Sequence, residues 1–183
     1  MLFRLGSYQA SPGQALETAA AFMKDGGAHA VKLEGGAPML PQVEVLAGAG
    51  IPVIGHLGLT PQSVNLLGGY RVQGRGEAGE KLMQDAKAME AAGACAVVLE
   101  VVPAELAARV SEMLTIPTIG IGAGPDTDAQ VIVWQDLVGL TPGPAPKFVK
   151  QYADVRTVIA DAVGQWGADV ASGAYPAPEH AYS

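Results

Sequence analysis

Short apolar segments alternate with amphipathic segments along this chain, and that alternation constrains its fold more than any other feature. The expected strands are 28–34, 51–57, 96–102, 116–122 and, more weakly, 137–140. Between most of them, apolar residues recur at helical spacing. Repeated strand–helix units favour a parallel sheet with helices outside it, so the predicted class is α/β.

Local end signals mark the expected helices. Ser11 followed by Pro12 is a typical helix start, and Gly26 with Gly27 is a typical stop. Further helices are expected over 41–49, 77–92, 103–114 and 154–171, with a short one that is capped by Thr127 and Asp128 and runs through Trp134. A glycine-rich loop is expected over 58–76, and an irregular tail over 173–183.

The order of these segments suits a (β/α)8 barrel. Such a barrel has eight strands and about 250 residues, whereas this chain has 183 residues and about five expected strands. An open doubly wound sheet and a barrel without its first part are the alternatives. Because the chain begins on a helix where a barrel begins on a strand, we favour an incomplete barrel with about five parallel strands. One domain is expected over 1–183.

The chain is acidic and poor in charged residues. Its formal net charge of −7 argues against a nucleic-acid or anionic-membrane binder, since both need a basic face. The charged share is 16%, below the usual share of about 25%, as expected for strands buried on both faces or for surface hidden in an oligomer. No apolar segment approaches the ~18 residues that span a bilayer, and no signal peptide is evident, so we expect a soluble, cytoplasmic protein.

Cys95, His29 and His180 are not candidates for a functional site. The single cysteine, Cys95, excludes an intramolecular disulfide, and because it lies in an apolar run we expect it to be buried as a small hydrophobic residue. His29 and His180 are expected to be structural or exposed to solvent.

Polar residues interrupt the apolar strands near their carboxyl ends, where active groups of parallel α/β proteins gather. Lys32 and Glu34 are two residues apart on one strand, so their side chains point to the same face. They either form a local ion pair or make an anion site beside a carboxylate ligand for a hard cation.

Glu100 and His56 lie near the carboxyl ends of two further expected strands. Glu100 follows four apolar residues; it either serves as a general acid or base, or it accepts hydrogen bonds from the first turn of the helix that begins at Pro103. A lone histidine such as His56 is more often structural than catalytic, so the residue pattern leaves its role open.

Two glycine-rich segments follow strands. Residues 120–124 lack the dinucleotide fingerprint and are expected to form a tight turn packed close to a ligand. The loop over 68–76 carries Arg71 and Arg75, which are either solvated or hold a substrate that bears a carboxylate.

Five ordered segments resemble one known family, ketopantoate hydroxymethyltransferase. They are AVKLEGG (30–36), GHLGLTPQS (55–63), GGYRVQGR (68–75), VLEVVP (98–103) and IGIGAG (119–124). The resemblance runs from about residue 6 to residue 182. It implies a (β/α)8 barrel that assembles as a homo-oligomer, a decamer in the family. It further implies transfer of a one-carbon unit from 5,10-methylenetetrahydrofolate to 3-methyl-2-oxobutanoate, with Mg²⁺ chelated by the oxo acid.

The resemblance also implies roles for four residues. Lys32 is expected to bind the substrate, Glu34 to belong to the metal site, Glu100 to accept the proton, and His56 to contact the substrate. A metal-dependent 2-oxo-acid lyase or mutase on a similar barrel is the alternative enzyme, and a non-catalytic remnant is the alternative of another class.

The chain departs from the family pattern at its start. It lacks the family's first three strands, which carry two aspartates and a serine of the metal and substrate site, and residues 1–5 stand where the third strand ends. Asp126 and Asp128, on the loop after the fourth strand, are not placed to replace those aspartates. We therefore expect a fragment that associates or is poorly soluble and has little activity alone.

Overall fold

The computed structural model describes residues 1–182 and divides into two compact units, Met1–Val131 and Ile132–Ser183. The expectation of one domain over 1–183 stays a prediction, and Ser183, the last residue of the expected tail, lies outside the described residues.

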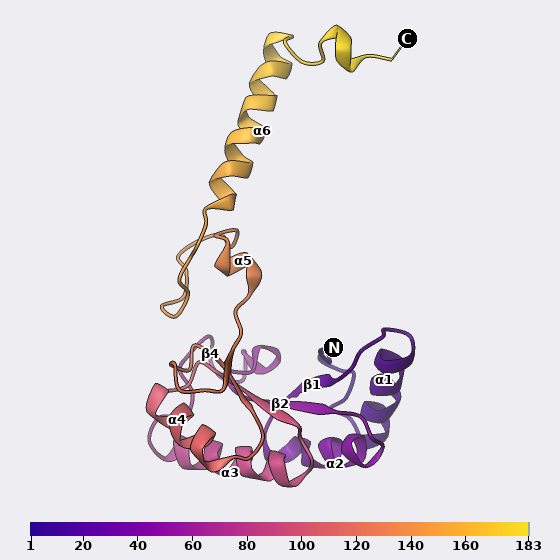
Figure 1. Cartoon of the computed structure of the whole chain (residues 1–183), viewed down its shortest axis with the longest axis vertical. Coiled ribbons are helices and arrows are strands. Elements are labelled where there is room, and N and C mark those ends of the chain that lie inside the picture. The colour runs from indigo at the N-terminus through magenta and orange to yellow at the C-terminus, as the bar shows by residue number, and fades with distance from the viewer. Residues whose placement is uncertain (183) are drawn as a thin grey trace. The chain divides into compact units, whose positions relative to one another are not determined.

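The first unit is built on one five-stranded parallel sheet (Figure 1). Its strands are β1 (Val31–Glu34), β2 (Val53–Gly58), β3 (Ala96–Glu100), β4 (Thr118–Ile121) and β5 (Ala129–Gln130). They lie side by side in chain order, each paired in parallel with the next. A doubly wound sheet reverses its strand order at a switch point, and the order from β1 to β5 has no reversal. The sheet is therefore an arc of a (β/α)8 barrel, as predicted.

The first residues of the chain extend this sheet beyond β1. Leu2 forms a parallel bridge with Lys32. The Phe3 N–H donates to the Lys32 carbonyl at 3.0 Å, and the Lys32 N–H donates to the Met1 carbonyl at 2.8 Å. This pairing fits the expectation that residues 1–5 stand where a strand before β1 ends.

Helices cover one face of the sheet. They are α1 (Pro12–Lys24), α2 (Leu40–Gly48), α3 (Glu77–Ala91) and α4 (Ala104–Met113), with short 3-10 turns η1 (Ala37–Met39) and η2 (Pro61–Ser63). Alternate strand residues point toward these helices and are buried: Val31, Leu33, Val53, Leu57, Val97 and Leu99. They pack with Leu46, Met89, Leu106 and Val110 of the helices in one hydrophobic cluster. The period of two along each strand leaves the opposite face free to carry other residues.

The sequence signals at the helix ends predicted the observed helix bounds closely. The Ser11 side chain accepts a hydrogen bond from the Gln14 N–H at 3.1 Å, as expected for the cap of α1. Each of the four helices begins and ends within a few residues of its predicted position.

The fifth strand was predicted in the wrong place. It lies at 129–130, while residues 137–140 continue from the helical turn α5 (Trp134–Leu137). Thr127 and Asp128 do not cap a helix. The Asp128 carboxylate accepts hydrogen bonds from the Thr118 N–H and hydroxyl at 2.8 and 2.9 Å, which fixes the chain beside β4 and allows β5 to pair there.

Cys95 is exposed, so the expectation that it is buried was wrong. It lies just before β3, and its N–H donates to the Val53 carbonyl at 2.8 Å. The uninterrupted buried part of that apolar run begins one residue later, at Ala96.

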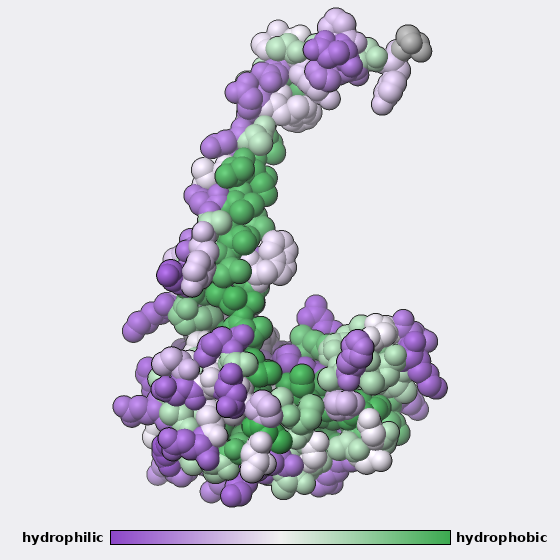
Figure 2. Space-filling model, viewed as in Figure 1, coloured by the Kyte–Doolittle hydropathy of each residue, from purple (hydrophilic) through white to green (hydrophobic). Residues whose placement is uncertain are grey.

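The second unit contains α5, the long helix α6 (Val155–Ser172) and a 3-10 turn η3 (Pro178–His180) in the tail. Asp154 caps α6 by accepting the Thr157 N–H at 3.2 Å, and Gly173 ends it with a φ of 77°. No residue of α6 is buried. Apolar side chains gather along this helix (Figure 2), and five of them are exposed: Val158, Ile159, Val163, Trp166 and Val170. Among residues 1–182, no helix has the length and apolar character needed to cross a bilayer.

Candidate functional site

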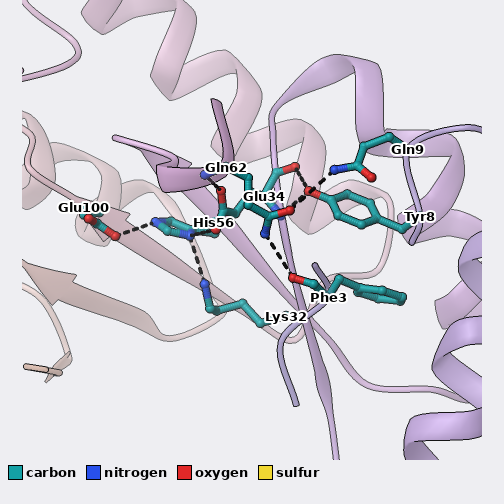
Figure 3. Close-up of polar contacts among 8 residues, drawn as sticks. All are labelled: Phe3, Tyr8, Gln9, Lys32, Glu34, His56, Gln62 and Glu100. Carbon is teal, nitrogen blue, oxygen red and sulfur yellow. Dashed lines mark hydrogen bonds and ion pairs between the residues drawn. The ribbon is translucent and has the colours of Figure 1, made fainter. Parts of the chain in front are cut away.

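Three neighbouring strands bring the predicted polar residues together on the face of the sheet opposite the helices (Figure 3). In the parallel register Glu34 of β1 stands beside His56 of β2, and Gly58 of β2 stands beside Glu100 of β3. Lys32 lies two residues before Glu34, on the same side of the pleat. We call Lys32, Glu34, His56 and Glu100 the polar cluster.

His56 occupies the centre of the polar cluster and is 1% exposed. The Lys32 ammonium donates a hydrogen bond to its Nδ1 at 2.9 Å. On the other side of the ring, Nε2 lies 3.1 Å from Glu100 Oε2. Glu34 Oε1 is more distant, at 3.8 Å from Nδ1. An ammonium has no lone pair to accept with, so Nδ1 is the acceptor and Nε2 carries the proton of the neutral ring.

The contact between His56 and Glu100 is close but poorly aligned. The distance of 3.1 Å is that of a hydrogen bond, yet Nε2 has no well-aligned acceptor among residues 1–182. Catalytic hydrogen bonds are often loose before substrate binds, because they align in the complex. The buried N–H of His56 is therefore available to a bound ligand as well as to Glu100.

Burial sets the electrostatics of the polar cluster. Desolvation lowers the pKa of Lys32 below its usual range, and the carboxylates of Glu34 and Glu100 oppose that shift. One ammonium faces two carboxylates, so the polar cluster carries a net negative charge when His56 is neutral. Such a group binds an organic anion better when a further cation is present.

Backbone geometry brings β2 and β3 close together at Glu100. The Leu59 N–H donates to the Glu100 carbonyl at 2.8 Å. A Cβ at Gly58 would collide with that carbonyl, so the position requires glycine. Val101, the next residue, has a φ of 49°, which a β-branched side chain rarely adopts. Strained backbone of this kind clusters at active sites and ligand-binding segments.

Two residues near Glu34 were missed by sequence reasoning. The Gln62 N–H donates to Glu34 Oε2 at 2.9 Å, and the buried Tyr8 hydroxyl donates to the Glu34 carbonyl at 2.9 Å. Gln62 belongs to the GHLGLTPQS segment, which was a signal that could have drawn attention to it. Nothing in the local pattern marked Tyr8.

The other candidate residues lie outside the polar cluster. Arg75 lines a separate depression of about 280 Å³ between the starts of α3 and α4, together with Arg109 and Glu80, which are paired at 3.0 Å. Asp128 is bonded to Thr118. Residues 120 and 121 belong to β4, and the chain bends after them; Gly124 has a φ of 81°, and a Cβ there would collide with Ala104. The ligand contact expected for this segment stays a prediction. The substrate contact suggested for Arg71 and Arg75 stays a prediction.

The polar cluster offers carboxylate oxygens but not a complete metal cage. Among residues 1–182, no group of three or more His, Cys, Asp or Glu side chains is arranged to hold a metal ion. Glu34 Oε2 is occupied by the Gln62 N–H, whereas Oε1 faces His56 without a hydrogen bond. Mg²⁺ commonly uses one or two carboxylates and takes its other ligands from water and substrate, and Glu34 fits that pattern.

Comparisons with known proteins give a consistent result. Residues 2–178 match the family described as ketopantoate hydroxymethyltransferase. Curated proteins named 3-methyl-2-oxobutanoate hydroxymethyltransferase are similar: 67% identity over 177 residues in Frankia alni, 64% over 177 in Frankia casuarinae and 60% over 179 in Thermobifida fusca. Each match covers 97% of this chain but only 58%, 60% and 64% of the relative. The chain thus spans about three fifths of the length of these relatives.

Proposed function

This chain belongs to the ketopantoate hydroxymethyltransferase family, and from that membership we propose that it takes part in the transfer of a hydroxymethyl group to 3-methyl-2-oxobutanoate, giving 2-dehydropantoate for pantothenate biosynthesis. The proposed one-carbon donor is 5,10-methylenetetrahydrofolate. The observation that carries the proposal is the polar cluster, in which Lys32 and Glu100 contact opposite nitrogens of the buried His56.

Glu100 is the proposed proton acceptor. Water adds to the folate-borne methylene carbon and both of its carbon–nitrogen bonds break, so that the two folate nitrogens take the protons of the water and formaldehyde is released. The Glu100 carboxylate takes the proton from carbon 3 of the oxo acid, and the resulting enolate carbon bonds to the formaldehyde carbon as its carbonyl π bond opens. The proton then passes from Glu100 to the alkoxide oxygen, which came from the water and becomes the hydroxyl of the product. The Glu100 side chain is 16% exposed, so it lies at the boundary between the polar cluster and solvent, where it can meet a ligand.

Lys32 and His56 are the proposed substrate contacts. The Lys32 ammonium is already partly desolvated, so it offers an oxo acid a strong charge partner at little further cost in hydration. The N–H at His56 Nε2 is buried and incompletely bonded, and it can donate to an oxygen of the same ligand. Lys32 and His56 hold one another through the hydrogen bond at Nδ1.

Glu34 is the residue that would contact Mg²⁺. When bound, the ion would polarise the oxo group and make the neighbouring carbon–hydrogen bond more acidic. It would also offset the net negative charge of the polar cluster, which otherwise opposes an anionic substrate. Glu34 Oε1 carries no hydrogen bond, and among residues 1–182 no group of three or more ligating side chains is arranged around a metal ion, so water and the oxo acid would supply most of the other ligands.

Family membership also suggests how the chain assembles and where it acts. We propose a homo-oligomer, with a decamer as the family pattern, and action in the cytoplasm. The unburied apolar side chains of α6 agree with a surface that is covered in an assembly.

A direct assay tests the proposed reaction. The chain is incubated with 3-methyl-2-oxobutanoate and 5,10-methylenetetrahydrofolate, with Mg²⁺ or with a chelator, and 2-dehydropantoate is measured by mass spectrometry. Product that requires Mg²⁺ and both substrates supports the proposal. If the oxo acid and Mg²⁺ bind by calorimetry and another product forms, the chain is a lyase or mutase instead. If neither binds, it is a non-catalytic remnant.

A further inference from the structure

The loop after β2 returns to the polar cluster through η2 and carries Gln62 there. The backbone N–H of Gln62 donates a hydrogen bond of 2.9 Å to Glu34 Oε2. The other oxygen, Oε1, is left facing His56. The direction of the Glu34 carboxylate therefore depends on where the η2 turn lies.

The side chain of Gln62 ties that turn to the start of the chain. Its amide Nε2 donates to the Phe3 carbonyl at 3.0 Å. The Gln9 amide lies at the outer limit of hydrogen bonding, 3.5 Å from Gln62 Oε1. Gln62 is half-buried, so its bond to Phe3 is partly shielded from competing water. A single residue thus joins the η2 turn to Phe3 with its side chain and to Glu34 with its backbone.

The same N-terminal segment also holds the backbone of Glu34. The Tyr8 hydroxyl donates to the Glu34 carbonyl at 2.9 Å and accepts the Glu34 N–H at 3.3 Å. Tyr8 is 1% exposed, and its ring packs against Phe3 with centroids 5.1 Å apart. Tyr8 thus holds the backbone of Glu34, and Gln62 holds its carboxylate (Figure 3). Tyr8 packs against Phe3, and Gln62 donates to the Phe3 carbonyl, so both contacts depend on the N-terminal segment.

From this arrangement we infer that Gln62 is a positioning residue for the Glu34 carboxylate. Its side chain holds the η2 turn against Phe3, the turn presents the Gln62 N–H to Oε2, and Oε1 stays directed toward the polar cluster. The functional part of this inference rests on the proposed function, in which Glu34 contacts Mg²⁺. Residues outside the set of metal ligands commonly change metal affinity by about 10- to 100-fold when they orient a ligand.

The test uses Gln62→Met in the full chain, which keeps the length of the side chain and removes its donor. The first readout is the hydrogen-exchange protection factor of the residue-62 amide, measured by NMR. Loss of a hydrogen bond with a net contribution of about 0.5–1.5 kcal/mol lowers that factor by about 2- to 10-fold. The second readout is calorimetric binding of Mg²⁺ in the presence of 3-methyl-2-oxobutanoate, which is expected to weaken by about 10-fold.

The matched control is Gln73→Met. Gln73 also lies on the loop between β2 and α3, but its side chain donates only to the nearby Arg71 carbonyl. This control is expected to change neither readout. Thermal unfolding of all variants shows that they are folded. If Gln62→Met unfolds, Gln62→Asn replaces it, because the shorter amide does not reach Phe3.

The outcomes distinguish the positioning of Glu34 by Gln62 from the proposed function of the chain. An unchanged protection factor at residue 62 overturns the inference, whether or not the chain binds Mg²⁺. A lowered protection factor with unchanged Mg²⁺ affinity also overturns it, since the turn would then move without affecting Glu34. If the wild-type chain binds neither ligand while the protection factor falls, the proposed function fails and the positioning of Glu34 by Gln62 stands.

Discussion

Helices α4 and α6 were both predicted from the sequence, but their side chains are buried to different extents. In α4 of the first unit, Leu106, Ala107 and Val110 are buried against the sheet. In α6 of the second unit no residue is buried, although it carries the apolar residues Val158, Ile159, Val163, Trp166 and Val170. The comparison separates what local sequence dictates from what tertiary packing adds. Helix formation follows from caps and residue spacing, whereas stabilisation by burial requires a partner surface.

The largest effect is expected at the polar cluster of the first unit. Glu100→Gln removes the proposed proton acceptor and keeps the size of the side chain. Loss of a general base typically lowers the rate by 10²- to 10⁴-fold, so product formation should fall by at least about 100-fold. Mass spectrometry of 2-dehydropantoate measures the effect.

The matched control for this change lies in the second unit. Glu179→Gln makes the same chemical substitution on an exposed residue of η3 and is expected to leave the rate unchanged. A comparable loss in both variants would show that the chemistry is not confined to the polar cluster.

A smaller effect, on stability, compares the two units directly. Leu99→Ala in β3 removes a side chain that is 0% exposed and should lower the free energy of unfolding by about 2–5 kcal/mol. Ile159→Ala in α6 truncates a side chain that is 50% exposed in the single chain, so at protein concentrations too low for assembly it should change this free energy by less than about 0.5 kcal/mol. Urea denaturation followed by circular dichroism measures both.

The result for Ile159→Ala also tests the proposed assembly. A loss as large as that of Leu99→Ala would mean that α6 is buried in solution, in an oligomer. Repeating the denaturation at several protein concentrations separates the two cases, because stabilisation by assembly depends on concentration.

Sequence alone predicted most of the first unit because its signals are local. Ser11 with Pro12 marked the start of α1, and strands at buried positions stood out as apolar runs. The polar cluster was predicted from two rules: side chains two residues apart on a strand point to the same face, and the carboxyl ends of parallel strands lie at one edge of the sheet. Lys32, Glu34, His56 and Glu100 do lie together, although their chemical roles stay predictions.

The remainder depended on contacts that are distant in sequence. The two-residue strand β5 is held by Asp128 through Thr118, ten positions away, and its own residues carry no apolar pattern. Tyr8 reaches Glu34 across 26 positions. Gln62 acts on Glu34 through its backbone N–H, which any residue type except proline could supply. Such interactions leave no periodic trace in the sequence.

Helix caps give a third and smaller contrast. Ser11→Ala removes the side-chain acceptor for the Gln14 N–H at the start of α1, a helix with the buried residues Ala15 and Ala19. Because α1 is part of the packed first unit, the free energy of unfolding should fall by about 1 kcal/mol. Denaturation with urea measures it, and Ser11→Asp, which restores an acceptor, should recover most of the loss. Equal stability of the alanine and aspartate variants would contradict a role for the cap.

The smallest effect is a pH dependence that distinguishes the two units by its readout. Hydrogen bonds from Thr157 lower the pKa of Asp154, and those from Thr118 lower the pKa of Asp128, each below the usual value for aspartate. A carboxyl whose folded pKa is depressed stabilises the fold fully above its unfolded pKa, about 3.9, and this contribution is lost as the pH falls through the lower folded value. Between pH 5 and pH 2, both contributions therefore decrease.

At Asp154 the loss should appear as gradual fraying of α6 in far-ultraviolet circular dichroism, since this helix has no buried residue to couple it to a core. At Asp128 it should appear as a lower midpoint of urea unfolding, since β5 pairs with the packed sheet. Asp154→Asn keeps an acceptor oxygen and does not titrate, so it should remove the gradual change and leave the urea midpoint unaffected. If Asp154→Asn shifted the urea midpoint instead, α6 and the sheet would unfold as one cooperative structure, and the contrast between the two units would not hold.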